Sequence, residues 1–122
     1  MNNHKTDQNT SIYSLRKNVQ KFVEARDWIK YHTPKSLIQA LQIEASELSE
    51  LFLFKDFSLE EILADEDFIS RINDEVADIF IYLLSFINAL DLDLSKAFDK
   101  KMEKNMRKYP VKDFNNGIYY KK

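Results

Sequence analysis

Two pairs of acidic residues stand out among the side chains of this sequence that could do chemistry. Glu44 and Glu47 lie three residues apart in "LIQALQIEASELSEL", and Glu75 and Asp78 repeat the spacing further along the chain. If both segments are helical, each pair lies on one helix face with its Cβ atoms about 5–6 Å apart. Glu44 also falls near the middle of an apolar stripe, where a leucine would be expected. The sequence therefore places carboxylates on a helix face that should pack against protein.

Carboxylates in such positions predict a divalent cation. An ionised carboxylate removed from water is costly unless it is paired or bound to a metal, and four such groups in one place repel one another. A cation offsets both costs. The chain has no Cys, and neither His4 nor His32 follows a Glu by three residues, as a di-iron carboxylate site requires. An all-oxygen ligand set favours Mg²⁺ or Mn²⁺. Either acidic pair alone would more often be a solvated helix face.

Three further polar residues lie on or beside apolar helix faces. Tyr82 follows Asp78 by about one turn on the same side of its predicted helix. Lys101 and Asn105 lie on or at the margin of the apolar face of the last predicted helix. Lys101 is also explained by a side chain that extends to solvent from the edge of a core, and Asn105 by a hydrogen-bonded core amide.

The elements that must position these residues are predicted to be helices. The sequence has 1 Gly and 2 Pro among 122 residues, which disfavours a sheet with many tight turns. Apolar periodicity predicts helices over about 11–28, 34–54, 67–90 and 94–109, and a short one beginning at Ser58. The third is apolar nearly all round beyond residue 76, so several partners should cover it. We expect an all-α fold whose four main helices form a helical bundle completed by homo-oligomerisation.

Composition and charge limit the domain organisation and the partners. We expect a flexible N-terminal segment over 1–10, one helical domain over 11–110 and a C-terminal tail over 111–122. The formal net charge of −2 indicates no nucleic acid polymer as partner. The longest nearly uncharged run is too short to span a membrane comfortably. The lack of Cys suits a reducing compartment, so we expect a soluble, cytoplasmic protein.

Four segments in order resemble one enzyme family. The segments "FVEARDWIKYHTPKSL", "EASELSELF", "DEVADIFIYLL" and "KMEKNMRKYP" together span roughly residues 19–111. They resemble the MazG-like, all-α nucleoside triphosphate pyrophosphohydrolases, and among these the dCTP pyrophosphatase branch. The resemblance implies Mg²⁺-dependent hydrolysis of a nucleoside triphosphate between its α- and β-phosphates, to a monophosphate and pyrophosphate. It also implies a helical bundle in dimers or tetramers.

The same resemblance implies a role for individual residues. Glu44, Glu47, Glu75 and Asp78 become metal ligands, and Glu44 or Glu47, or a water that one of them orients, acts on the attacking water. The implied contacts to substrate are Trp28, His32, Phe54 and Tyr82 around the base, and Lys101, Asn105, Lys108 and Tyr109 at the phosphates and sugar. Phe54 replaces a tryptophan of close relatives and loses the indole N–H. Lys108 replaces an arginine and loses its bidentate fork.

These features predict one activity and leave two alternatives. The predicted substrate is a pyrimidine deoxynucleoside triphosphate, such as dCTP or a modified dCTP, and the predicted role is housecleaning of the nucleotide pool. One alternative is a non-catalytic, nucleotide-sensing or regulatory helical dimer that keeps the pocket without turnover. The other is a dUTP-directed member of the same superfamily.

Overall fold

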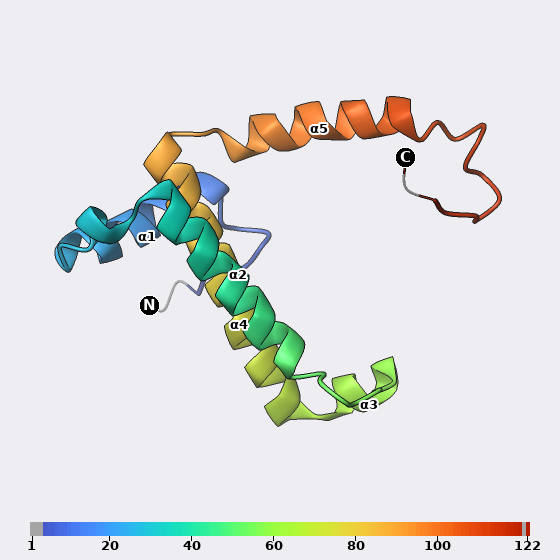
Figure 1. Ribbon diagram of the computed structural model, residues 1–122, viewed down its shortest axis with the longest axis horizontal. Coiled ribbons are helices and arrows are strands. Elements are labelled where there is room, and N and C mark those ends of the chain that lie inside the picture. The colour runs from blue at the N-terminus through green and yellow to red at the C-terminus, as the bar shows by residue number, and fades with distance from the viewer. Residues whose placement is uncertain (1–3, 121) are drawn as a thin grey trace. The chain divides into compact units, whose positions relative to one another are not determined.

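The computed structural model describes residues 4–120 and 122, and these are helical or irregular with no β-strand (Figure 1). In chain order the elements are α1 (Ile12–Ala25), the 3₁₀ turn η1 (Ile29–Tyr31), α2 (Pro34–Glu50), α3 (Leu59–Ala64), α4 (Glu66–Leu90) and α5 (Leu94–Lys108). The predicted all-α fold with four main helices and a short helix after Ser58 is confirmed. No helix among the described residues is both long and apolar enough to cross a lipid bilayer.

Each α-helix begins at a side chain that caps its exposed backbone N–H groups. In every case the side-chain oxygen of the capping residue accepts a hydrogen bond from the backbone N–H three residues later. The capping residues, in order from α1 to α5, are Ser11, Thr33, Ser58, Asp65 and Asp93. In α2 the cap is followed by Pro34, whose fixed φ suits the first helical position. The sequence thus marks all five starts locally.

Two helices end earlier than their apolar periodicity predicts. The first ends at Ala25 rather than at residue 28, because Asp27 adopts a positive φ of 55° and the Trp28 N–H donates to the Val23 carbonyl at 3.1 Å. The second ends at Glu50 rather than at residue 54, and turns follow it. These predicted ends are wrong because the hydrophobic pattern continues through turns that contain no glycine or proline.

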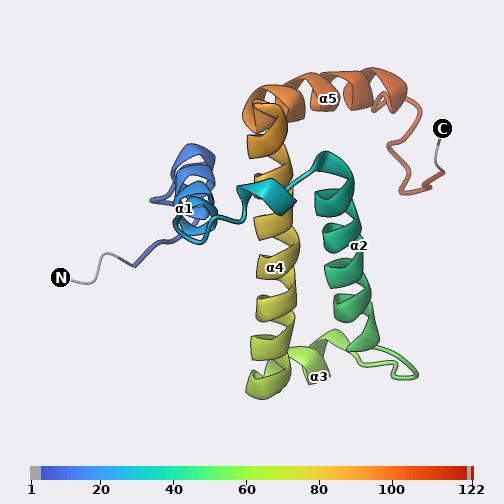
Figure 2. The same ribbon diagram turned by 60° about the vertical axis from the view of Figure 1, so that its left-hand side comes forward.

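The chain divides into two compact units, Met1–Asp91 and Leu92–Lys122. In the first unit α4 is the central helix. It packs most extensively on α2 and less on α1 and α3, and Figure 2 shows α2 and α4 side by side and running in opposite directions. The buried apolar residues of this unit are Val23, Leu37, Phe68, Leu84 and Ile87. Phe68 also contacts the rings of Phe52 and Phe57, with centroids 5.3 and 5.1 Å away.

A reciprocal pair of hydrogen bonds fixes α1 to the C-terminal half of α4. The Arg16 Nε donates to Asn88 Oδ1 at 3.0 Å, and Asn88 Nδ2 donates back to the Arg16 carbonyl at 3.1 Å. Arg16 also lies 3.9 Å from the carboxylate of Asp91. Because the amide of Asn88 is held at both its oxygen and its nitrogen, its orientation is fixed.

The second unit consists of α5 and the chain that follows it. The Tyr109 ring packs on Phe114 with centroids 5.1 Å apart, and Phe114 packs on Tyr120 at 4.9 Å. The Lys122 N–H donates to the Tyr109 hydroxyl at 2.9 Å. The predicted C-terminal tail therefore folds back on its own unit through an aromatic cluster.

Candidate active site

Three acidic side chains of α2 and α4 come together where these helices lie side by side. Glu44, Glu75 and Asp78 each offer a carboxylate oxygen, and these oxygens lie within 4.8 Å of one another. Ligands on opposite sides of one Mg²⁺ stand about 4 Å apart, since each Mg–O bond is about 2.0–2.1 Å. The group therefore needs only a small contraction to hold one hard cation.

Two of these oxygens are buried and have no hydrogen-bond partner. They are Glu44 Oε2 and Glu75 Oε2, on residues that are half-buried, whereas Asp78 is exposed. A buried acceptor without a partner is rare in folded proteins because it loses its hydration without replacement. A divalent cation would supply that missing partner, so the residues present fit a metal site of the Mg²⁺ type.

The raised pKa values of Glu44 and Glu75 also favour a bound cation. Burial, followed by the neighbouring Glu47 carboxyl, raises the pKa of Glu44 to about 7. Burial, followed by the charge of Glu47, also raises the pKa of Glu75. Because its pKa is raised to about 7, Glu44 carries a proton in much of the metal-free protein at neutral pH. A bound cation would displace that proton.

Glu47 lies at the rim of the acidic group rather than in its centre. It is exposed on α2, one turn after Glu44, and it is not one of the three residues whose oxygens gather within 4.8 Å. Its carboxyl is nevertheless close enough to Glu44 and Glu75 to raise the pKa of both. The Glu47 carboxyl is therefore accessible to solvent and also lies beside the acidic group.

Three of the residues predicted to contact the base lie on or beside two elements of the first unit, α4 and η1. Tyr82 is half-buried on α4, one turn beyond Asp78. Trp28 caps η1 and is 43% exposed, and its ring meets Phe22 edge-on at 5.8 Å. His32 follows η1 and is half-buried, and burial lowers the pKa of its imidazole.

Phe54 differs from these residues in its exposure. It lies in the turns after α2 with a positive φ of 59°, and its side chain is 98% exposed. In this chain, Phe54 therefore has almost no contact with the protein around it.

The predicted phosphate and sugar contacts belong to the second unit. Lys101 and Lys108 are exposed on α5, and Asn105 is half-buried there. Tyr109 caps the helix and donates its backbone N–H to the Asn105 carbonyl at 2.8 Å. The ammonium of Lys108 lies 5.6 Å from the centre of the Tyr109 ring. These four residues thus lie along the second half of α5 and at its C-cap.

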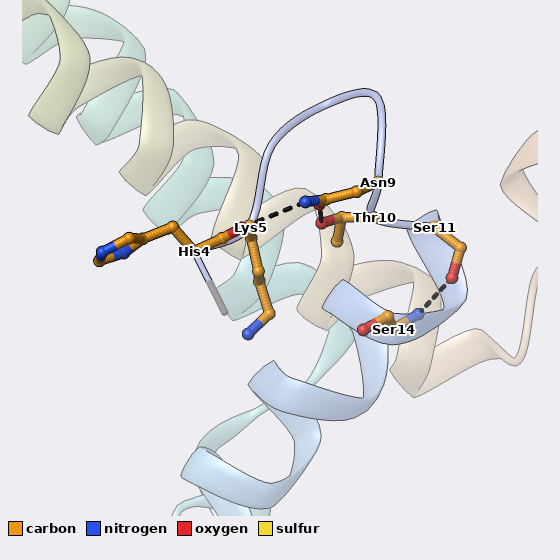
Figure 3. A pocket seen from close by; sticks show the side chains of 6 residues that line it. All are labelled: His4, Lys5, Asn9, Thr10, Ser11 and Ser14. Atoms are coloured by element: carbon orange, nitrogen blue, oxygen red, sulfur yellow. Dashed lines mark hydrogen bonds between the residues drawn. The ribbon is translucent and has the colours of Figure 1, made fainter. Parts of the chain in front are cut away.

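A separate hollow of about 440 Å³ lies at the N-terminus of α1 (Figure 3). It is lined by His4, Lys5, Asn9, Thr10, Ser11 and Ser14. Asn9 organises this segment, because its Oδ1 accepts from the Thr6 N–H and its Nδ2 donates to the His4 carbonyl. Residues 1–3 of the predicted flexible segment lie outside the described residues. None of the four acids lines this hollow, so it is distinct from the candidate metal site.

Comparison with known proteins places the chain in a family. Residues 40–121, which include all four acids, match the model of the MazG-like family. The chain belongs to the MazG-like family. The resemblance seen in the sequence is therefore confirmed.

Relatives of this MazG-like chain include curated enzymes and a solved structure. It is 33% identical over 105 residues to dCTP pyrophosphatase 1 of Bos taurus and 32% identical over 109 residues to dCTP pyrophosphatase 1 of Homo sapiens. Each match covers 83% of this chain and 60% of the relative, so the chain spans about 60% of the length of these curated relatives. The crystal structure of a pyrophosphatase from Archaeoglobus fulgidus superposes with a TM-score of 0.73 at 35% identity, covering 90% of this chain and 98% of that one.

Three residues that sequence reasoning did not single out line a pocket with one predicted base contact. Gln20, Ser85 and Asn88 line one pocket with His32. Ser85 follows Asp78 by seven residues, which is two helical turns, so this spacing was the available signal. Gln20 lies on α1 rather than on α4, so no spacing in the sequence relates it to Asp78.

Proposed function

We propose that this protein is a Mg²⁺-dependent pyrophosphohydrolase that converts a nucleoside triphosphate to the monophosphate and pyrophosphate. The observation that carries the proposal is the group of three carboxylates between α2 and α4, two of them with a buried oxygen that lacks a partner. The relatives named dCTP pyrophosphatase 1 support a pyrimidine deoxynucleoside triphosphate, such as dCTP or a modified dCTP, as substrate. Housecleaning of the nucleotide pool is the corresponding role.

In the proposed reaction, three of the four acids bind the cation and the fourth acts as general base. Glu44, Glu75 and Asp78 would hold the cation, which supplies charge neutralisation at the phosphates and a lower pKa for bound water. Glu47, exposed at the rim, orients the attacking water and accepts its proton as the oxygen joins phosphorus and the α–β anhydride bond breaks. Positioning and electrostatic stabilisation carry most of the rate in phosphoryl transfer, so no covalent intermediate with the protein is needed.

The substrate contacts extend this proposal. The rings of Trp28, Phe54 and Tyr82 supply aromatic surface for a base, and Lys101 and Lys108 supply positive charge for phosphate oxygens. Asn105 and Tyr109 lie beside these lysines in the same unit and would bind the sugar. Support comes from their match to the family segments and from the position of the last four along the second half of α5 and at its C-cap.

Turnover of deoxynucleoside triphosphates tests the activity directly. With Mg²⁺, we expect at least one canonical or modified pyrimidine triphosphate to give monophosphate and pyrophosphate in equal amounts, measured by anion-exchange chromatography. Chelation of the metal should remove the product. Release of orthophosphate alone would show that another bond is cut. Binding of a nucleotide with Mg²⁺ but without product would favour a nucleotide sensor instead.

We also propose that the protein is a homo-oligomer, a dimer or a tetramer. Apolar side chains remain exposed along the two central helices of the first unit, including Ile43 at 60% and Val76 at 49%. On α5, Phe98 and Met106 are 66% and 62% exposed. Large apolar surfaces of this kind commonly mark protein–protein contacts.

Light scattering coupled to size exclusion tests this assembly. We expect a mass two or four times that of one chain, and a lower mass for Ile43→Glu, because a charge would be buried without a partner in the interface. Gln42→Glu, at the adjacent exposed position of α2, is the control and should keep the wild-type mass. A monomeric wild-type protein would contradict the proposal.

A further inference from the structure

The chain after α5 turns back on the end of that helix through two turns (Figure 1). Pro110 follows the helix, and the Asp113 N–H donates to the Pro110 carbonyl at 3.0 Å, which closes the first turn. In the second turn the Ile118 N–H donates to Asn116 Oδ1 at 3.1 Å. Gly117, the one glycine of the sequence, has a positive φ of 78° there, a conformation that residues with a Cβ adopt at a cost. The sequence of the tail thus favours this return to the helix.

The returning chain packs on one residue that the proposed function assigns to the substrate. The Phe114 ring contacts the Tyr109 ring with centroids 5.1 Å apart, and Tyr120 packs on Phe114 at 4.9 Å. Tyr109 and Phe114 are both half-buried by these contacts. The ammonium of Lys122 lies 5.7 Å from the centre of the Phe114 ring. Three residues of the tail therefore support the Tyr109 ring, directly or through Phe114.

The hydroxyl of Tyr109 is held by a backbone group of the tail. The Lys122 N–H donates to this oxygen at 2.9 Å. A phenolic hydroxyl can accept from one donor and still donate its own proton. Because the N–H approaches the oxygen as a donor, the hydroxyl proton must point away from it. A bond accepted in this way also polarises the O–H group and strengthens the bond that it donates. The tail thus orients the hydroxyl to donate to an oxygen atom of a ligand.

The Tyr109 ring also lies beside one of the predicted phosphate contacts. The ammonium of Lys108 lies 5.6 Å from the centre of this ring. A cation is attracted to an aromatic face at this distance, so the position of the ring limits where the ammonium rests. An exposed lysine otherwise loses the freedom of several rotatable bonds when a ligand immobilises it. A fixed ring therefore helps to place two neighbouring groups, the Tyr109 hydroxyl and the Lys108 ammonium.

We propose that the tail is a positioning element for substrate binding, in which Phe114 and the Lys122 N–H hold Tyr109. Tyr109 then donates to the sugar, and Lys108 meets the phosphates with less conformational entropy to lose. The inference rests on the proposed function, because it takes Tyr109 and Lys108 to contact a nucleotide. It adds to that function a role for the tail, which the sequence analysis left without one.

A substitution that removes only the backbone N–H of residue 122 tests the hydrogen bond. Lys122→Pro lacks this N–H, whereas Lys122→Ala keeps it and is the matched control. Binding of the α,β-methylene analogues of the four common deoxynucleoside triphosphates is measured by calorimetry with Mg²⁺, and KM and kcat by product formation. We expect Lys122→Pro to weaken binding and raise KM by about threefold to tenfold, with kcat within about twofold. Lys122→Ala should stay within about twofold of the wild type in both.

Substitutions at Phe114 test the ring contact in the same assays. Phe114→Ala removes the ring that packs on Tyr109 and should weaken binding at least about threefold. Phe114→Tyr keeps an aromatic ring at this position and should restore binding close to that of the wild type. Tyr119→Ala removes a ring that is 78% exposed and lies outside the aromatic cluster, so it should have no effect. If Phe114→Ala misfolds, as circular dichroism would show, Lys122→Pro still decides the question.

A double-mutant cycle shows whether the tail acts through Tyr109. Tyr109→Phe removes the hydroxyl that the Lys122 N–H holds, and by itself should weaken binding by about threefold to tenfold. In the Tyr109→Phe background, Lys122→Pro should have no further effect, because the hydrogen bond is already absent. A merely structural role of the tail would instead give the same loss in both backgrounds.

The outcomes separate this inference from the proposed function. Wild-type affinity and KM in Lys122→Pro would overturn the positioning role, even if the enzyme hydrolyses triphosphates. Independent effects of Tyr109→Phe and Lys122→Pro in the cycle would overturn it as well. Conversely, binding that depends on the tail in a protein without turnover would support the positioning role while the proposed activity fails. Failure of all four analogues to bind would overturn both.

Discussion

Glu47→Gln should lower the rate of triphosphate hydrolysis at least about a hundredfold while leaving the melting temperature nearly unchanged. A positioned general base contributes about 10²–10⁴ to a rate, and glutamine cannot accept the proton. Glu47 is exposed at the rim of the acidic group, so its replacement should change the free energy of unfolding by no more than about 0.5 kcal/mol. The measurements are kcat at saturating substrate and Mg²⁺, and thermal unfolding followed by circular dichroism.

The matched control is Glu50→Gln, which changes the same residue type three positions later at the end of α2. Glu50 is exposed and lies outside the group of three carboxylates, so its variant should keep the wild-type rate. If Glu47→Gln retained most of its activity, Glu47 would have no essential role and the attacking water would need another base.

The metal-free protein should lose stability as the pH rises from about 4.5 to about 7. In the folded chain the pKa of Glu44 is raised to about 7, whereas its ordinary value is 4.5. The folded state therefore holds a proton that the unfolded state has released in this interval. Stability falls with pH wherever the folded state binds more protons, so this contribution is fully present below pH 4.5 and is lost as pH passes 7.

Mg²⁺ should reverse this loss, because it replaces the proton among Glu44, Glu75 and Asp78 and binds only the folded state. The increase in melting temperature on adding Mg²⁺ should be small near pH 4.5 and large above pH 7. Differential scanning fluorimetry with chelator or Mg²⁺ over this range measures both effects. Glu44→Gln is the reference, since it lacks the titrating carboxyl, and the difference between wild type and variant isolates the contribution of Glu44. An equal response to Mg²⁺ at both ends of the range would contradict this account.

Sequence alone determined the helices of this protein because their signals are local. Apolar residues three and four positions apart define each helix, and capping side chains such as Thr33 and Ser58 mark the starts within one turn. The ends were less predictable. Asp27 and Phe54 adopt positive φ in the turns that follow α1 and α2, although neither is glycine. The apolar periodicity does not predict those turns.

The acidic pairs were also recognisable in the sequence. The spacing of Glu44 with Glu47, and of Glu75 with Asp78, depends only on helical geometry, and the apolar surroundings of Glu44 marked it as unusual. Periodicity within one helix says which residues share a face. It does not say which face of a second helix lies opposite, since that depends on how the two helices pack.

Only the tertiary structure decided which acids meet. The antiparallel packing of α2 on α4 brings Glu44 to Glu75 and Asp78 and leaves Glu47 at the rim, although the two acids of each pair are equally spaced along their helices. The same packing, with α1 held by Arg16 and Asn88, brings Gln20 and Ser85 to one pocket. These contacts join residues distant in the chain, and their energy comes from burial and hydrogen bonds that exist only once the helices have docked.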